Sequence, residues 1–271
     1  MKRRSSTRGN HAVAVTAEAD LRALADALGD TPETVGSTHL LRRGLCKAWI
    51  VGDVAAPAAA VVQSDFCPTE PVGFGADPEL LWKLLLRADG WDCFLVSSSC
   101  APAIAERMRE HTGGPVRFVA DINFRLDRPV KRFANPAVRL LAADDAPLLR
   151  NAAHDVAGSG YRDVEELLQE AIAAAAIVDG TIVSVAYTPA RSAKFADIGV
   201  HTLEAFRRRG YAQAAASLAA QRVQAAGQTP VWSTGDFNTA SLKLAKDLGF
   251  VEMLRQTYVV KTVTKADQNG C

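Results

Sequence analysis

The sequence predicts an α/β protein built from two domains, and three observations support this. The chain has 271 residues, a length that suits two domains of ordinary size. In its second half, short apolar or β-branched runs alternate with longer helical patterns, and Asp179-Gly180 between two such runs is a strong signal for a β-hairpin. A glycine turn at Gly210 then joins a short strand to a long alanine-rich helix.

In the first half we expect three helices and four strands, in the order helix, strand, strand, helix, strand, helix, strand. The expected helices cover residues 17–28, 78–87 and 101–110, and Gly113-Gly114 closes the last one. The expected strands cover residues 47–51, 59–63, 93–97 and 116–126, with Gly52-Asp53 in the first connection. This order repeats much of the second half. The first domain is therefore either a degenerate copy of the second domain's fold or an unrelated α/β domain.

The second half is expected to follow the order β-α-α-β-β-β-α-β-α-β. Strands are expected at residues 138–141, 175–178, 181–187, 195–202 and 230–234, and the last strand contains Tyr258. Helices are expected at residues 144–153, 161–173 and 211–226, and a fourth runs from Asn238 to Leu248-Gly249-Phe250.

The stretch 128–136 is predicted to connect the two domains, because its two prolines and three basic residues oppose a regular element. We expect the first domain at residues 11–130, the linker at 131–136 and the second domain at 137–263. A basic disordered tail is expected at residues 1–10 and a carboxyl-terminal tail at 264–271.

Arg207-Arg208-Arg209-Gly210-Tyr211-Ala212 carries the clearest functional signal. It lies at the expected amino terminus of a helix, where the first N–H groups have no intrahelical partner and carry partial positive charge. Gly210 allows the backbone to come close to an anion, and Ala212 keeps that approach open. The stretch therefore predicts a binding site for a pyrophosphate.

These residues and their surroundings resemble the GNAT superfamily, the GCN5-related N-acetyltransferases, and are similar to its two-domain bacterial group. The resemblance rests on Arg-x-x-Gly-x-Ala at 207–212, Asn238-x-x-Ser241 and Leu248-Gly249-Phe250, and it covers residues 138–260. It implies a GNAT fold in the second half, with a mixed sheet flanked by helices. It also implies transfer of an acetyl group from acetyl-CoA to an amine of a small molecule or peptide, by direct attack in a ternary complex and without a metal.

The resemblance places acetyl-CoA where the strands at 195–202 and 230–234 separate. The backbone from Val200 to Leu203 is expected to pair with the pantetheine arm as another strand would. We expect at least one of the three arginines to contact phosphate. The alternative is that all three are ordinary surface charges. The expected cofactor-binding residues are Val200, Thr202, Leu203, Arg207, Arg208, Arg209, Gly210, Tyr211, Ala212, Gln213, Asn238 and Ser241.

Acyl transfer needs an oxyanion donor and a base. The resemblance implies a backbone N–H near the strand separation, from Leu203 or Thr202, as the oxyanion donor. Asp197 is the candidate base, or else a structural carboxylate. Strand alternation places it on the face opposite to Thr202 and Val200, unless a bulge shifts the register. Other candidates for roles at the acceptor are His201, His154, Glu165 and Glu166.

The general acid departs from the family pattern. Relatives often have a tyrosine seven positions after the asparagine, and here that position is Ala245. A thiol with a pKa of about 8.5 leaves as thiolate with little assistance. Ser241 lies one helical turn earlier and is expected to orient a water or touch the pantetheine. Asn238 is expected to cap its helix whether or not it meets CoA, and Tyr258 is a distant alternative acid.

Composition narrows the partners. The net charge of +1 gives no support for nucleic-acid or membrane binding, and no apolar run reaches the length of a membrane span. Five cysteines without paired spacing predict free thiols in a reducing cytoplasm, and Cys100 at a strand-to-helix junction is either a reactive thiol or an inert one. We expect a cytoplasmic monomer or homodimer. The alternative function is a CoA-binding regulatory or scaffold protein with weak or no catalysis.

Overall fold

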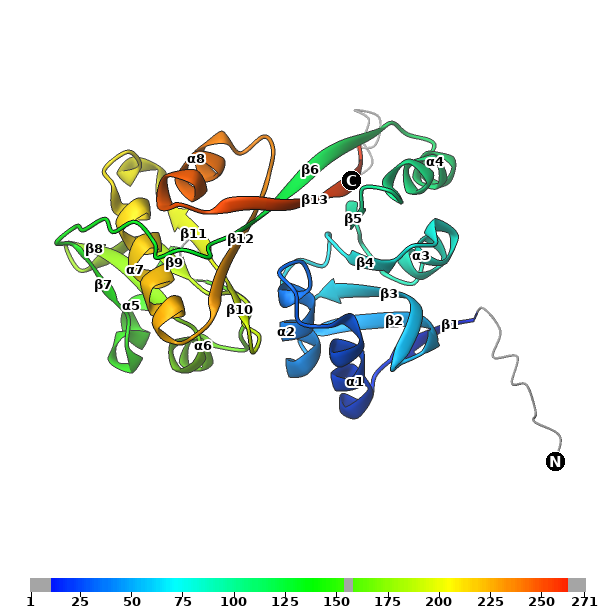
Figure 1. The fold of residues 1–271 in the computed structure, drawn as a ribbon, viewed down its shortest axis with the longest axis horizontal. Coiled ribbons are helices and arrows are strands. Elements are labelled where there is room, and N and C mark those ends of the chain that lie inside the picture. Colours follow the sequence, from blue (N-terminus) through cyan, green and yellow to red (C-terminus); the bar gives the residue numbers. More distant parts are fainter. Residues whose placement is uncertain (1–10, 154–157, 263–271) are drawn as a thin grey trace. The chain divides into compact units, whose positions relative to one another are not determined.

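The computed structural model describes residues 11–153 and 158–262, and it divides into two compact units. The first unit takes the described residues of 1–29, 41–120 and 255–271, and the second takes 30–40 and 121–254 (Figure 1). Each unit is therefore discontinuous in sequence, whereas the expected domains are continuous. Two strands, β6 (Val116–Arg125) and β13 (Val251–Lys261), have residues in both units.

The first unit is built on a mixed sheet with strand order β1-β2-β3-β4-β5-β13. Its other strands are β1 (Ala12–Val15), β2 (Cys46–Asp53), β3 (Ala56–Ser64), β4 (Val72–Gly75) and β5 (Cys93–Ser97). Its helices are α1 (Glu18–Leu28), α3 (Pro78–Leu85) and α4 (Ala101–Thr112). Leu81 and Leu84 of α3 and Ile104 and Met108 of α4 pack on Phe94 of the sheet, and all five are fully buried.

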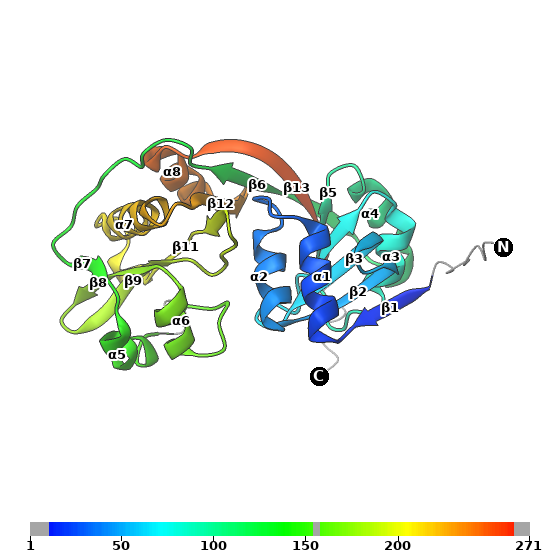
Figure 2. The same ribbon diagram turned by 60° about the horizontal axis from the view of Figure 1, so that its bottom comes forward.

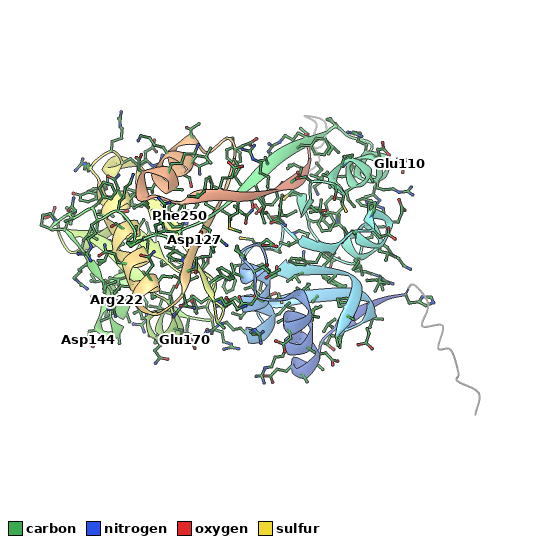
Figure 3. The ribbon with its side chains drawn as sticks, in the orientation of Figure 1. Glu110, Asp127, Asp144, Glu170, Arg222 and Phe250 are labelled. Atoms are coloured by element: carbon green, nitrogen blue, oxygen red, sulfur yellow. The ribbon has the colours of Figure 1, made fainter. Side chains whose placement is uncertain are left out.

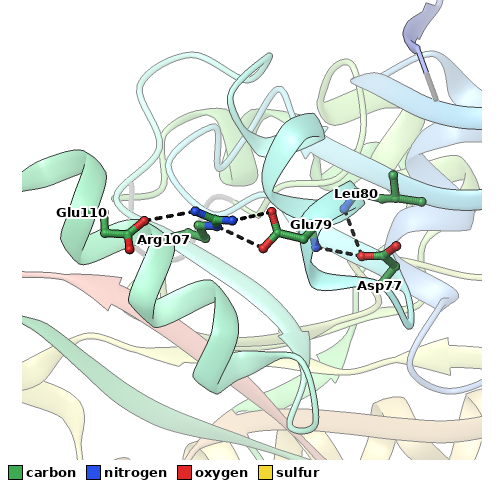
Figure 4. A network of polar contacts seen from close by, with 5 residues as sticks. All are labelled: Asp77, Glu79, Leu80, Arg107 and Glu110. Atoms are coloured by element: carbon green, nitrogen blue, oxygen red, sulfur yellow. Dashed lines mark hydrogen bonds and ion pairs between the residues drawn. The ribbon is translucent and has the colours of Figure 1, made fainter.

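Local chemistry explains where these helices begin and end. The Asp77 side chain accepts hydrogen bonds from the backbone N–H groups of Glu79 and Leu80, which caps α3. Arg107 of α4 then binds Glu79 through two nitrogens and also pairs with Glu110 (Figure 4). These exposed ion pairs join two helices and stabilise them only modestly. Gly113 ends α4 in the left-handed conformation, as expected from the sequence.

The second unit contains two sheet segments, β6-β12-β10 and β11-β9-β8-β7. The strands are β7 (Val138–Leu140), β8 (Ala173–Val178), β9 (Thr181–Tyr187), β10 (Phe195–Asp197), β11 (Gly199–Thr202) and β12 (Thr229–Gly235). The helices are α2 (Val35–Arg43), of which residues 35–40 belong here, α5 (Ala146–Arg150), α6 (Val164–Glu170), α7 (Tyr211–Ala225) and α8 (Thr239–Leu248).

Helices cover both faces of the second unit (Figure 2). One core joins α7 and α8 to Phe124 and Trp232, and the other joins α5 and α6 to Val185 and Tyr187. Side chains are drawn in Figure 3, where Arg222 marks α7 and Phe250 marks the turn from α8 into β13.

The helix expected at 161–173 is present only over α6, residues 164–170, and the strand expected at 175–178 begins earlier, at Ala173. Ala174, Ala175 and Ala176 are completely buried, and α7 packs against this strand. Alanine favours helices in isolation, but its small side chain lets another element pack closely, so tertiary contacts decide here.

Most of the expected elements are confirmed, including the hairpin turn at Asp179-Gly180, where both residues have positive φ. Three elements were not predicted: β1, α2 and β4. Gly52 and Asp53 belong to β2 and not to the connection. The strand expected at 195–202 is divided into β10 and β11 at Ile198.

Residues 128–136 form neither helix nor strand and lie along α7 (Figure 1). The Ser217 hydroxyl donates to the Lys131 carbonyl at 2.9 Å and accepts from the Phe133 N–H at 3.1 Å. Two helical turns further along α7, the Gln224 side-chain amide accepts a hydrogen bond from the Val130 N–H and donates one to the Arg128 carbonyl. Side chains of α7 therefore satisfy backbone groups that no strand or helix satisfies.

Candidate active site

Two parallel strands separate in the second unit. β10 pairs in parallel with β12 from Phe195–Thr229 to Asp197–Val231, and the Ile198 N–H still donates to the Val231 carbonyl at 3.0 Å. β11 then pairs with β9, while β12 beyond Val231 pairs with β6. No strand ladder within the described residues joins β11 to β12, so the strands part directly after Ile198.

The pairing of β11 with β9 determines which backbone groups face this opening. The Leu203 N–H donates to the Val183 carbonyl at 3.0 Å. Because backbone groups alternate in direction along a strand, the N–H and C=O groups of Val200 and Thr202 point away from β9. Leu203 is therefore committed to the sheet, which removes its N–H as the oxyanion donor. Of the two backbone N–H groups expected as candidates, that of Thr202 still faces the opening. The N–H group of Val200 faces the opening as well.

The arginine-glycine loop lies immediately after β11. A short 3₁₀ turn, η3 (Glu204–Phe206), leads into it, and Arg208 and Gly210 both have positive φ, at 62° and 78°. α7 begins at Tyr211, and no side chain caps it. The first N–H groups of the helix have no intrahelical acceptor, so they are available to an anion.

The three arginines around this loop are exposed, and two of them bond to nearby carbonyls. The Arg207 Nε donates to the Thr202 carbonyl at 3.4 Å, and an Arg209 nitrogen donates to Ala205 at 3.2 Å. The Arg209 guanidinium also lies 5.2 Å from the centre of the Phe206 ring. These contacts hold two positive charges beside the start of α7.

The amino terminus of α8 follows β12. The Asn238 side chain accepts from the Ser241 N–H at 3.1 Å, so the expected helix cap is present. The Ser241 hydroxyl accepts a hydrogen bond from the Trp232 indole at 2.9 Å, which fixes Ser241 to β12. Ala245, at the position of the family tyrosine, is fully buried in the core. A tyrosine there would need different packing around α8.

Asp197 lies at the end of β10, on the opposite face from α7 and α8. Its register partner Val231 belongs to a small core with Val35 and Ala190, whereas Ile198 and Val200 pack with α7. The alternation argument from the sequence therefore describes the observed strand. The pKa of Asp197 is raised to about 7, first by burial and second by the negative charge of Asp121, against a lowering contribution from the Ile198 N–H.

The sequence did not indicate Asp121 as a site residue. It is buried in β6, in the half of the chain that precedes the linker, and the Asn123 side chain donates to it at 3.1 Å. The pairing of β6 with β12 brings it into this unit. A pairing between strands over a hundred residues apart leaves no local signal, so only the structure could reveal it.

His39 is a second residue that the sequence analysis missed. It is buried, its Nε2 lies 2.9 Å from the Gly160 carbonyl, and its Nδ1 accepts from the Arg191 N–H at 3.2 Å. The same Nδ1 also lies 3.3 Å from the Arg191 carbonyl. His39 therefore joins α2 to the loops before α6 and β10, and Tyr161 packs edge-on against it.

The other candidates have structural partners or lie elsewhere. Glu165 forms an ion pair with Arg150, and Glu166 accepts from the Arg162 side chain and backbone. His201 is exposed on β11, and Tyr258 belongs to the first unit, opposite Leu95. His154 lies outside the described residues. The strand opening thus lies beside β11, which leads into the glycine loop, and β12, which leads into α8, whereas Asp197 lies on the face opposite to α8.

Comparison with known proteins gives this arrangement its class. Residues 138–260 match the family model described as GNAT acetyltransferase. This part of the chain is therefore similar to GNAT acetyltransferases. No curated protein matches the sequence.

Solved structures extend the likeness over nearly the whole chain. A GCN5-related N-acetyltransferase-like protein from Streptococcus suis is 22% identical with a TM-score of 0.65, covering 90% of this chain and 99% of that one. A Drosophila protein is 12% identical with a TM-score of 0.66, covering 94% and 99%. A tandem GNAT protein from the clavulanic acid biosynthesis pathway is 13% identical with a TM-score of 0.54, covering 92% and 98%. At these identities the likeness concerns the fold.

Two further observations concern the described residues alone. None of their helices combines the length and apolar character needed to cross a membrane. Their His, Cys, Asp and Glu side chains form no group of three or more that could hold a metal ion.

Proposed function

We propose that the protein is an N-acetyltransferase that transfers the acetyl group of acetyl-CoA to an amine by direct attack in a ternary complex. The observation that carries the proposal is the separation of β11 from β12 directly before a glycine turn and an uncapped helix start. The edge of β11 exposed by the separation receives the extended pantetheine arm, and the glycine turn with the start of α7 receives the pyrophosphate. We assign this chemistry to the domain at 137–263.

The geometry gives the donor a direction. The pyrophosphate binds the backbone amides of residues 208–213, supported by Arg207 and Arg209. The pantetheine then runs along the outward backbone groups of Thr202 and Val200. This path brings the thioester to the Val200 end of β11, close to where the strands part. The Val200 N–H is thus the better placed of the two donors for the oxyanion of the tetrahedral intermediate.

Asp197 is the proposed base for two reasons. It lies at the end of β10, next to the point where the strands part, and its raised pKa suits proton acceptance near neutral pH. An ammonium proton passes to its carboxylate, and the freed nitrogen lone pair attacks the thioester carbon. The C–N bond forms, the C–S bond breaks, and the thiolate leaves with the electron pair. The thiolate then takes a proton from the new amide nitrogen through solvent. With Ala245 at the tyrosine position, no side chain there assists this step.

The donor site is tested by Gly210→Glu. A carboxylate at the start of α7 occupies the place of the pyrophosphate and repels it, so acetyl-CoA affinity measured by titration calorimetry should fall by at least about tenfold. Gly227→Glu is a matched control, because Gly227 also has positive φ and open space around its Cα, but it follows the other end of α7. Gly210→Ala separates backbone strain from charge. Unchanged affinity in Gly210→Glu removes the loop from the donor site.

A second candidate is a CoA-binding regulatory or scaffold protein without catalysis. The buried Ala245, which leaves no hydroxyl at the family's acid position, favours it. The two candidates separate when acetyl-CoA is incubated with a broad panel of primary amines and free thiol is measured. Thiol release that depends on an amine supports the transferase. Tight binding with no such release across the panel supports the regulatory protein.

A further inference from the structure

The carbonyl of Thr202 faces the strand opening, but a side chain already covers it. The Arg207 Nε–H donates a hydrogen bond to this oxygen at 3.4 Å. The bond is long and the arginine is exposed, so a stronger partner can displace it. In the protein without ligand, a guanidinium therefore lies on the part of β11 along which the pantetheine arm is proposed to run.

The other polar groups of Thr202 are not covered by a charged side chain. Its hydroxyl lies 2.7 Å from the hydroxyl of Ser184, which is fully buried and donates to the His201 carbonyl at 3.1 Å. Because Ser184 has one proton and gives it to that carbonyl, the Thr202 hydroxyl is the donor to Ser184. The Thr202 N–H faces the opening and has no partner among the described residues. Only the carbonyl is thus held by a cation.

The short turn η3 explains how Arg207 reaches back to Thr202. The backbone N–H of Arg207 donates to the Glu204 carbonyl at 3.2 Å, which fixes the start of its side chain between the end of β11 and the glycine loop. Arg209 is held differently, because its side chain bonds to the Ala205 carbonyl. Arg207 is therefore the arginine of this loop that lies both on the strand edge and beside the proposed phosphate site.

The rest of the Arg207 guanidinium is available to an anion. Apart from the bond made by Nε, its N–H groups have no partner within the part of the chain that the structure describes. Arginine binds phosphate most strongly through two parallel N–H groups, and one such arrangement uses Nε together with a terminal nitrogen. This arrangement withdraws the Nε proton from the Thr202 carbonyl. A phosphate and the strand edge thus compete for the same donor.

We propose that Arg207 is a specificity-determining residue that selects acyl donors bearing a phosphate, because it covers the Thr202 carbonyl until a phosphate binds its guanidinium. The inference rests on the proposed function, since it takes the pantetheine arm to pair with β11. A thioester of pantetheine alone has to displace Arg207 and offers it no anion in return. A thioester of CoA gives the guanidinium a charge-assisted partner and uncovers the strand edge in the same event.

The first test compares two donors that share the thioester and the pantetheine arm. Acetyl-CoA carries the pyrophosphate, whereas S-acetylpantetheine carries no phosphate. Amide NMR titrations of the full-length protein, followed at Val200, measure both affinities. Arg207→Ala should weaken acetyl-CoA binding at least about fivefold and strengthen S-acetylpantetheine binding about twofold. An arginine that only binds phosphate would weaken the first and leave the second unchanged, and that result overturns the inference.

Arg208→Ala is the matched control. Arg208 is also exposed, it is adjacent in the sequence, and its side chain bonds to no described residue. Its removal lowers the positive charge of the loop by the same amount as Arg207→Ala. We expect weaker acetyl-CoA binding and an unchanged affinity for S-acetylpantetheine. If Arg208→Ala strengthens S-acetylpantetheine binding as much as Arg207→Ala does, the effect belongs to the charge of the loop and the inference is wrong.

The second test observes the Thr202 carbonyl directly and uses inorganic pyrophosphate alone. In the parent, pyrophosphate should move the carbon-13 signal of this carbonyl, because the carbonyl loses its N–H donor, and in Arg207→Ala it should not. A Thr202 signal that stays in place while the amides of residues 211–213 respond overturns the inference alone. No response of these amides to either pyrophosphate or acetyl-CoA overturns the proposed donor site, and the inference with it.

Discussion

Asp197 illustrates how a proposed catalytic group reduces the stability of the protein that carries it. Its folded-state pKa of about 7 lies above the ordinary value of 3.8, so the folded protein binds this proton more tightly than the unfolded chain. The free energy of unfolding is therefore highest, with respect to this group, below about pH 4, where Asp197 is protonated in the folded protein. This contribution is lost as the pH rises from there to about 7. Above pH 7 the loss has an upper bound of about 4 kcal/mol, reduced by the partial exposure of the side chain.

Asp197→Asn should therefore stabilise the protein while slowing the reaction. An asparagine resembles the protonated form and never ionises, so the melting temperature of the variant should exceed that of the parent at pH 8. The difference should shrink as the pH falls toward 4. Differential scanning calorimetry across this range measures both effects, with Asp247→Asn as the control for loss of a carboxylate. Parallel pH dependence in the variant and the parent would contradict the raised pKa.

At this scale, residues with a local role could be identified from the sequence. The Asn238 cap and the Gly210 turn depend on neighbours within a few positions, so their spacing predicted them. Asp121 and His39 act on partners that are distant along the chain, and nothing near them in sequence distinguishes them from ordinary core residues. The functions assigned to Asp197 and the loop stay predictions.

Among the elements, α7 has two separate tasks. Its amino terminus faces the proposed pyrophosphate, while Ser217 and Gln224 hold the segment 128–136 against its side. Ser217 is fully buried and bonds with two backbone groups of that segment. A buried N–H that loses its acceptor is costly, so this serine should matter more than its position in a helix suggests.

Ser217→Ala should destabilise the second unit by about 1 to 2 kcal/mol, because the Phe133 N–H and the Lys131 carbonyl lose their partner. Hydrogen exchange should accelerate at the Phe133 amide, while the Val130 amide should respond only to Gln224→Ala. Each variant is thus the control for the other. Equal exchange at Phe133 in the parent and in Ser217→Ala would show that the contact holds nothing in place.

Element types could largely be predicted, but their limits and pairings could not. Turn glycines and caps determined the hairpin at 179–180 and the ends of α4 and α8. The start of β8 at Ala173 was missed, because alanine favours helices in isolation and only packing against α7 decides for a strand here. α2 was not predicted, and its histidine makes contacts that only the folded unit provides.

For the whole molecule, the two units are not the two halves of the chain. The second unit needs residues 30–40, which supply Val35 and His39, and it needs β6, which covers one edge of β12. A fragment made of residues 126–271 lacks both. Its β12 presents an unpaired edge, and its core at Val231 is open to water.

This fragment should consequently fail to fold as a compact domain. We expect broad amide signals in a two-dimensional NMR spectrum and aggregation on gel filtration, even though the fragment contains every residue matched by the family model. A chain that begins at residue 11 is the control and should give dispersed signals. A soluble, monomeric fragment that binds acetyl-CoA normally would contradict this account of the second unit.

The last strand within the described residues also constrains when folding can take place. β13 pairs with β5 from Gln256–Ser97 to Val260–Cys93, so it completes the sheet of the first unit although it is synthesised after the second unit. During translation, the first hundred residues leave the ribosome without this strand, and their sheet has an open edge for as long as synthesis continues. The first unit therefore reaches its final structure only after the second unit has been translated, and a premature stop at residue 255 removes the part of β13 that pairs with β5.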